Sequence, residues 1–220
     1  MWPVTSDQPF QIRHATTIAE LQEFERWAGL ADSGGPVTAA RLVEAHTSGF
    51  LATSLNPAAG GGGDVAALER GGPEAIGWAH SFALIALLDD TPIGGLLAGP
   101  SLHWLSSIPP QFGFEPMLQG MIRTTKLHFV SVEESQRRSG AGSALVRAAI
   151  ETAHSACVDL FYGQFDTSST HLARFYSDLG CTLHRPGAPL DFSALLGIPG
   201  GPVPGPGEAF FSRAFSYGGR

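Results

Sequence analysis

The segment VEESQRRSGAGSAL (132–145) has two adjacent arginines and two glycines directly before a run of good helix formers. It follows an alternating stretch that is typical of a β-strand. This order puts Gly140 and Gly142 at the N-terminus of a helix, where unpaired backbone N–H groups and the helix dipole attract anions. Arg137 and Arg138 add positive charge at the same point. The segment predicts a binding site for a diphosphate group.

Two other glycine-rich phosphate loops do not fit this segment. The dinucleotide-binding fingerprint requires a third glycine, and Leu145 stands in its place. The nucleoside-triphosphate loop requires Gly-Lys-Ser/Thr, and no lysine follows Gly142. A tight turn that binds no ligand would produce the same short motif, so both interpretations stay open on these residues alone.

The elements that would position this loop form a mixed α/β pattern. Short alternating or apolar runs predict strands, and amphipathic runs predict helices. The expected strands are 11–16, the two arms of a hairpin within 82–101, 126–132, 159–165, 181–185 and 209–215. The expected helices are 18–30, 41–46, 139–155 and 170–180. We expect one domain over 1–220.

Three segments differ in composition from the expected helices and strands. Residues 53–76 are rich in glycine and proline and predict a mobile insertion, and residues 186–207 predict a Pro/Gly-rich loop. The aromatic, proline-broken segment 101–122 is either a loop that packs on the core or the wall of a substrate pocket. In the second case, the residues that would line an acceptor pocket are His103, Trp104, Phe112 and Phe114.

Composition narrows the choice of partners. The net charge of −7 argues against nucleic acid, because phosphate binding usually shows as a basic surplus. The longest apolar run, 82–90, ends at two aspartates and is far shorter than the roughly 20 residues that span a membrane. The start MWPVTSDQPF has no signal-peptide pattern. Cys157 and Cys181 have neither metal-site nor disulfide spacing, so we expect a cytoplasmic protein without a metal or a membrane contact.

The glycine segment resembles motif A of the GCN5-related N-acetyltransferases. The pattern of that motif, Arg/Gln-x-x-Gly-x-Gly/Ala, is present as Arg137-x-x-Gly140-x-Gly142. LARFYSDLG (172–180) resembles the second landmark of the family, a helix that carries Phe-Tyr and ends in Leu-Gly before a strand. The two landmarks have the order and separation found in the family, and the expected elements fit over most of the chain.

The resemblance implies a central, twisted, mostly antiparallel sheet of about six to seven strands, flanked by helices and splayed into a V between the fourth and fifth strands. It also implies acetyl-coenzyme A (acetyl-CoA), or another acyl-CoA, as co-substrate. The amides of the glycine segment would hold the pyrophosphate, and two strand residues would pair with the acyl carbonyl and the pantetheine. The implied cofactor-binding residues are Val130, Val132, Arg137, Arg138, Ser139, Gly140, Ala141, Gly142, Ser143 and Ser169.

Moving an acyl group from a thioester to an amine requires a neutral amine, a donor for the oxyanion and a proton for the departing thiolate. By the resemblance, Tyr176 is the acid that gives this proton, and a phenol with a pKa of about 10 stays protonated at neutral pH. A tyrosine that only packs in the core is the alternative. Ser168 or Ser169 would cap the helix that carries Tyr176, where the family often has asparagine.

His128 is the candidate base, because an imidazole with a pKa of about 6.5 can take a proton from an amine. The resemblance supports it, since arylalkylamine acetyltransferases have a histidine at the corresponding strand position. The histone-acetylating branch has a glutamate two residues earlier, where this chain has Lys126. Glu133 and Glu134 are alternatives, and His171 is expected to point away from the tyrosine. Strict alternation would put Leu127, Phe129 and Ser131 on one face and His128, Val130 and Val132 on the other.

The first hypothesis for the function is an acyl-CoA-dependent N-acyltransferase that moves acetyl to the primary amine of a small molecule by direct attack in a ternary complex. The acidic balance favours a small amine over a histone-like tail. A non-catalytic acyl-CoA-binding sensor or partner module is the alternative, and a longer acyl chain or an ester product stays open. Members of the family often pair, which implies a homodimer.

Overall fold

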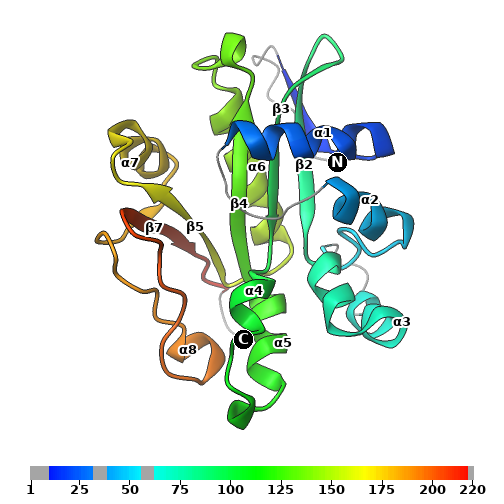
Figure 1. Cartoon of the computed structure of the whole chain (residues 1–220), viewed down its shortest axis with the longest axis vertical. Coiled ribbons are helices and arrows are strands. Elements are labelled where there is room, and N and C mark those ends of the chain that lie inside the picture. The colour runs from blue at the N-terminus through cyan, green and yellow to red at the C-terminus, as the bar shows by residue number, and fades with distance from the viewer. Residues whose placement is uncertain (1–9, 32–38, 56–61, 218–220) are drawn as a thin grey trace.

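The computed structural model describes residues 10–31, 39–55 and 62–217. In this part of the chain seven strands form one sheet, in the order β1-β2-β3-β4-β5-β7-β6 (Figure 1). The strands are β1 (Gln11–His14), β2 (Phe82–Leu88), β3 (Thr91–Gly99), β4 (Thr124–Val132), β5 (Leu160–Asp166), β6 (Thr182–Leu183) and β7 (Glu208–Ala214). The helices are α1 (Ile18–Leu30), α2 (Ala39–Thr47), α3 (Gly62–Ala79), α4 (Leu102–Leu105), α5 (Glu115–Arg123), α6 (Ala141–Ser155), α7 (Thr170–Asp178) and α8 (Ser193–Leu196), with short 3-10 turns η2 (Pro110–Phe112) and η3 (Glu134–Gln136). None of the described helices has the length and apolar character that a membrane crossing requires.

The sheet opens between β4 and β5, which run parallel while the other described neighbours run antiparallel. The paired residues are Thr124 with Leu160, Thr125 with Phe161 and Lys126 with Tyr162. β7 pairs with β5 from Leu160 to Asp166, whereas β4 stays with β3. Beyond Lys126 the two strands separate, and β5 and β7 lean away from β4 (Figure 1). The expected mixed α/β fold with a splay between the fourth and fifth strands is confirmed.

β2 and β3 form the predicted hairpin. Its turn consists of Asp89 and Asp90, whose φ angles are both positive, at 48° and 61°. Two-residue hairpin turns that match the twist of the strands need this left-handed backbone, and aspartate adopts it more readily than most residues do. The turn pairs two apolar strands that both lie inside the sheet, and Phe82 to Leu87 are all buried.

Helices cover both faces of the sheet. α6 lies behind it and buries Leu145, and α1 lies across the front and buries Trp27 (Figure 1). A lower cluster, which includes Ile76, Met121 and Phe210, fills the end of the molecule where α3, α5 and α8 meet the sheet. The core therefore holds β4 rigidly from both sides, while the space beside its upper half stays open.

Two segments are more regular than the sequence predicted. Residues 53–76, expected as a mobile insertion, include the greater part of α3, which is kinked at Gly72, while 56–61 lie outside the described residues. One face of α3 packs into the lower cluster, so tertiary packing outweighs the weak helix propensity of its glycines. Residues 101–122 form α4, η2 and most of α5, and 186–207 are irregular apart from α8.

Trp27 lies tightly over a glycine of β3. A Cβ atom on Gly95 would stand 2.2 Å from the Cε3 atom of Trp27, whose exposed fraction is 0%. We expect Gly95→Ala to lower the free energy of unfolding by about 1–3 kcal/mol, because the indole has no space to move away. Urea unfolding followed by tryptophan fluorescence measures this change.

The matched control for Gly95 is Gly29→Ala on α1, since a Cβ atom at Gly29 meets no atom within 4 Å. Alanine favours a helix over glycine by roughly 0.5–1 kcal/mol, so this variant should unfold at the same or a higher urea concentration than the wild type. An unchanged unfolding midpoint for Gly95→Ala would contradict the tight packing of Trp27.

Candidate functional site

The space between the separating strands is a cleft of about 1290 Å³. Its walls are the open half of β4, the loop and first turn of α6, the end of β5, the first turns of α7 and the start of β7. The predicted site residues that line it are His128, Val130, Val132, Arg137, Arg138, Gly140, Gly142, Ser143, Ser169 and Tyr176. The structure thus brings the glycine loop, the strand residues and the tyrosine to one cleft.

The loop before α6 has several unused backbone donors. Gly140 turns the chain into the helix with a φ of 96°, a conformation that glycine adopts without strain. The N–H of Ala141 donates to Oγ of Ser139 at 3.3 Å, and the N–H of Ser139 donates to the carbonyl of Gln136 at 3.4 Å. No acceptor among the described residues binds the N–H groups of Arg138, Gly140, Gly142 and Ser143. Four donors are therefore available to a ligand at this edge of the cleft.

Two guanidinium groups stand beside these amides, although the whole chain has a net charge of −7. Arg137 and Arg138 are exposed, and within the described ranges neither has a carboxylate partner. Glu133, an alternative base, pairs with Arg26 on α1 instead, and Glu134 is exposed in η3. Open amides at a helix N-terminus beside two free guanidinium groups form an environment that suits phosphate.

His128 is the extra residue of a β-bulge in β4. β3 pairs Leu97 with Phe129 and Ala98 with Leu127, so His128 has no partner in that register. Leu127 packs in the core on the α6 side of the sheet, whereas Phe129 packs on the α1 side. The strict alternation expected from the sequence is therefore wrong here, because a bulge shifts the order of the side chains by one residue.

The imidazole of His128 lines the cleft and is held neutral. Burial lowers its pKa to about 4, the charge of Lys126 acts in the same direction, and hydrogen bonds to the carbonyls of Gly99 and Pro100 oppose part of the shift. A histidine with the ordinary pKa of about 6.5 would be partly charged near neutral pH. His128 is instead present in the form that can accept a proton, although its low pKa makes it a weak base.

Tyr176 both packs in the core and lines the cleft. Its ring stacks on Phe211, with centroids 3.7 Å apart and planes inclined by 14°, and Phe175 meets it edge-on at 5.0 Å. Only 5% of the residue is exposed, and this burial raises the pKa of the phenol, with Cys181 acting in the same direction. Tyr176 therefore stays protonated, which is the state that an acid for a thiolate requires.

The N-terminus of α7 forms another part of the wall. Ser169 stands at the N-cap as expected, yet its side chain makes no capping hydrogen bond. The turn before it is closed by Asp166, whose Oδ1 accepts a hydrogen bond from the N–H of Ser168 at 2.8 Å. His171 also lines the cleft, although it is exposed whereas Tyr176 is buried. α7 thus contributes residues from more than one of its turns to the cleft wall.

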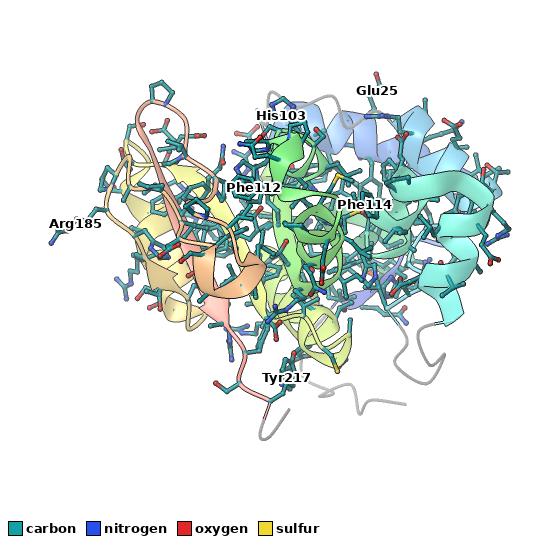
Figure 2. All side chains as sticks on the ribbon, turned by 90° about the horizontal axis from the view of Figure 1, so that it is seen from below. Glu25, His103, Phe112, Phe114, Arg185 and Tyr217 are labelled. Carbon is teal, nitrogen blue, oxygen red and sulfur yellow. The ribbon has the colours of Figure 1, made fainter. Side chains whose placement is uncertain are left out.

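The aromatic candidates for an acceptor pocket lie elsewhere. Trp104 packs edge-on against Phe192 at 5.1 Å in the lower cluster. Phe112 and Phe114 are 38% and 42% exposed. Both lie with the exposed His103 on the α4–α5 segment, at the end of the molecule that faces the viewer in Figure 2. None of the four lines the cleft, because α5 packs on α8 below the paired part of β4 and β5.

Three polar residues that sequence reasoning missed meet where β4 and β5 begin to separate. Nζ of Lys126 donates to Oε1 of Gln164 at 3.4 Å, and Nε2 of Gln164 donates to Oε2 of Glu208 at 2.8 Å. The N–H of Gly205 donates to the same carboxylate oxygen at 2.8 Å. The three side chains come from β4, β5 and β7, so only the pairing of these strands brings them together. The one signal in the sequence is that Lys126 is the single lysine of the chain.

A sequence model of the family described as acetyltransferase (GNAT) family matches residues 51–181. A comparison with the curated proteins found no match. Among solved structures, the chain is similar to YncA from Salmonella typhimurium with its cofactor acetyl-CoA, at 14% identity over 94% of each chain and a TM-score of 0.55.

Two further solved structures share the fold. The ribosomal-protein-alanine N-acetyltransferase from Brucella melitensis has 17% identity over 93% of this chain and 99% of that chain, with a TM-score of 0.52. The ribosomal-protein-S18-alanine N-acetyltransferase from Escherichia coli has 12% identity over 96% of each chain, with a TM-score of 0.52. At such identities these structures show a common fold and no more.

The family match reaches the site itself. Residues 51–181 contain the open amides before α6, His128 on β4 and Tyr176 on α7. The match covers more than half of the chain and includes both sequence landmarks. This chain belongs to the acetyltransferase (GNAT) family.

Proposed function

We propose that the protein transfers an acetyl group from acetyl-CoA to the primary amine of a small molecule, by direct attack within a ternary complex. The observation that carries this proposal is the set of unused backbone donors at the N-terminus of α6, in a cleft that leads to Tyr176. Such donors bind phosphate groups, and CoA contains a diphosphate. Membership of the family supports the acyl transfer, and the YncA structure with acetyl-CoA supports this cofactor.

The open edge of β4 offers a place for the rest of the cofactor. β5 pairs with β4 only as far as Lys126, so the backbone of 127–132 is free of β5 on that edge. An extended chain with amide groups, such as pantetheine, can bind a free strand edge as an added strand does. The two arginines of the loop add guanidinium donors for phosphate. In this arrangement the acyl carbonyl lies near Val130 and the sulfur lies near Tyr176.

Bound acetyl-CoA supplies an activated acyl carbonyl, and side chains of this protein handle the protons. The neutral imidazole of His128 accepts a proton from the amine as the nitrogen bonds to the acyl carbon. As the carbon–sulfur bond breaks, Tyr176 donates its phenolic proton to the departing thiolate. The amine attacks the acyl group directly, so no covalent enzyme intermediate forms.

Gly140→Asp should weaken the binding of CoA by about 100-fold or more. The new carboxylate would repel the diphosphate, and losing two charge-assisted hydrogen bonds of about 1.5–3 kcal/mol each corresponds to at least this factor. Titration calorimetry with CoA measures the change. Gly113→Asp is the matched control, because Gly113 also has a positive φ, of 75°, and has open space around it outside the cleft. Equal affinities of Gly140→Asp and wild type for CoA would refute the diphosphate site.

Tyr176→Phe should lower kcat by roughly 100-fold or more and leave the affinity for CoA unchanged. Phenylalanine keeps the ring stacked on Phe211, so the fold is preserved while the proton donor is lost. Free-thiol release from acetyl-CoA across a panel of amines measures kcat. A kcat within about twofold of the wild type would remove Tyr176 as the acid.

A wild type that binds CoA but turns over no amine would favour the non-catalytic acyl-CoA-binding module.

His128→Ala should lower kcat/KM by roughly 100-fold, and the ratio of wild type to variant should stay constant from about pH 5 to about pH 8. The pKa of His128 is lowered to about 4, so the imidazole is neutral over this range and its contribution is lost only as the pH falls toward 4. The ratio cancels the ionisation of the acceptor, which is common to both enzymes. A ratio that drops below about pH 6.5 would indicate an unshifted histidine, and a ratio of one would remove His128 from the mechanism.

A further inference from the structure

Lys126 is the single lysine of a chain whose other basic side chains are arginines and histidines. It is the last residue of β4 that pairs with β5, opposite Tyr162, and it lines the cleft there. Lysine is ordinarily found on the solvated surface, whereas this residue is half-buried. Along β4, Val132 and Val130 lie between Lys126 and the glycine loop that precedes α6. Lys126 is therefore on the far side of the proposed thioester position, where the acceptor would bind.

The ammonium group of Lys126 is incompletely compensated. No described carboxylate lies within ion-pair distance of it. Its contact at 3.4 Å is with the neutral amide oxygen of Gln164, a distance at the long end for a hydrogen bond. Burial lowers the pKa of Lys126, and the charge of Glu208 opposes part of this shift. A charge taken out of water needs a counter-charge, so this ammonium is suited to bind an anionic group.

Glu208 presents the opposite charge with one oxygen unused. Its Oε2 is fixed by Nε2 of Gln164 and by the N–H of Gly205, both at 2.8 Å. Its Oε1 accepts no hydrogen bond from the residues that the structure describes, and Glu208 lines the cleft. Asp166, which pairs with Glu208 across the strands, already binds the N–H of Ser168. One carboxylate oxygen of Glu208 is therefore available to an amino group.

Gln164 fixes the spacing between the two charges. Its carbonyl faces the ammonium of Lys126 and its amino end faces the carboxylate of Glu208, so the amide cannot flip without losing both contacts. The charges are thereby kept one amide group apart and do not meet directly. An α-amino acid carries the complementary pair of charges, a carboxylate and an amino group, and a molecule that binds between Lys126 and Glu208 requires these two groups to be held apart.

We propose that the acceptor is a zwitterion of the α-amino acid type, bound with its carboxylate on Lys126 and its amino group on Oε1 of Glu208. This inference rests on the proposed function, because it names the substrate of the same site. A polyamine would bring a second positive charge toward Lys126. The N-terminus of a peptide has a neutral amide where the carboxylate should be. Both classes should bind more weakly than a free amino acid.

The test uses the whole 220-residue chain loaded with CoA, a panel of L-amino acids, and the amides of the same amino acids, which lack the carboxylate. Titration calorimetry measures the affinity of each compound for the CoA-bound protein, and thiol release from acetyl-CoA measures turnover. We expect the wild type to bind and turn over its preferred amino acid at least about tenfold better than the corresponding amide.

Two variants separate the roles of the charges. Lys126→Met should abolish the preference, because it weakens the binding of the amino acid and leaves the binding of the amide unchanged. Glu208→Gln should weaken the binding of both compounds alike, by about tenfold or more. Both should bind CoA as the wild type does, which shows that they are folded. The matched controls are Arg185→Met and Glu25→Gln. Figure 2 labels both residues, which are exposed and lie outside the cleft. These controls should change neither the affinity for the amino acid nor the affinity for its amide.

The outcomes distinguish this inference from the proposed function. If no amino acid binds the CoA-loaded protein, or if Lys126→Met keeps the preference, the inference is overturned even when other amines release thiol. Amino acids that bind with the expected variant pattern but release no thiol would support the zwitterion site and contradict the proposed acetyl transfer.

Discussion

Two parallel strands that part after the pairing of 124–126 with 160–162 are the constraint on which the rest of the structure depends. β4 keeps its hydrogen bonds with β3, and β5 keeps its own with β7, so neither strand is free to close the gap. Backbone groups on the inner edges of the gap lack a strand partner, and backbone groups shielded from water require partners. A ligand with amide groups can supply them, and we therefore propose the splay as the binding site.

Burial within the splay also sets the charge of the side chains there. It lowers the pKa of His128 to about 4 and raises the pKa of Tyr176, so both side chains are neutral at pH 7. The charged groups lie at the two ends of the cleft: the arginines and open amides of the phosphate loop at one end, and Lys126 with Glu208 at the other. In the proposed reaction the charged substrates bind at these ends, and the protons move in the neutral part between them.

Local sequence patterns predicted the features that depend on neighbouring residues, namely the hairpin of β2 and β3, Gly140 before α6 and the helix that carries Tyr176. Features that depend on strand register could not be predicted from one sequence. The bulge at His128 appears only when β4 is aligned with β3, and the bridge that begins at Lys126 needs three strands. For 101–122 the sequence leaves packing on the core and lining a pocket open, because composition does not tell which cluster a segment will join; in the structure Trp104 joins the lower cluster.

The most direct test of the central claim is a crystal structure of the protein with acetyl-CoA. We expect oxygen atoms of the diphosphate about 2.7–3.2 Å from the backbone nitrogens of Gly140, Gly142 and Ser143, and the thioester between Val130 and Tyr176. A cofactor whose diphosphate lies away from the N-terminus of α6, or whose thioester does not enter the splay between β4 and β5, would contradict the account.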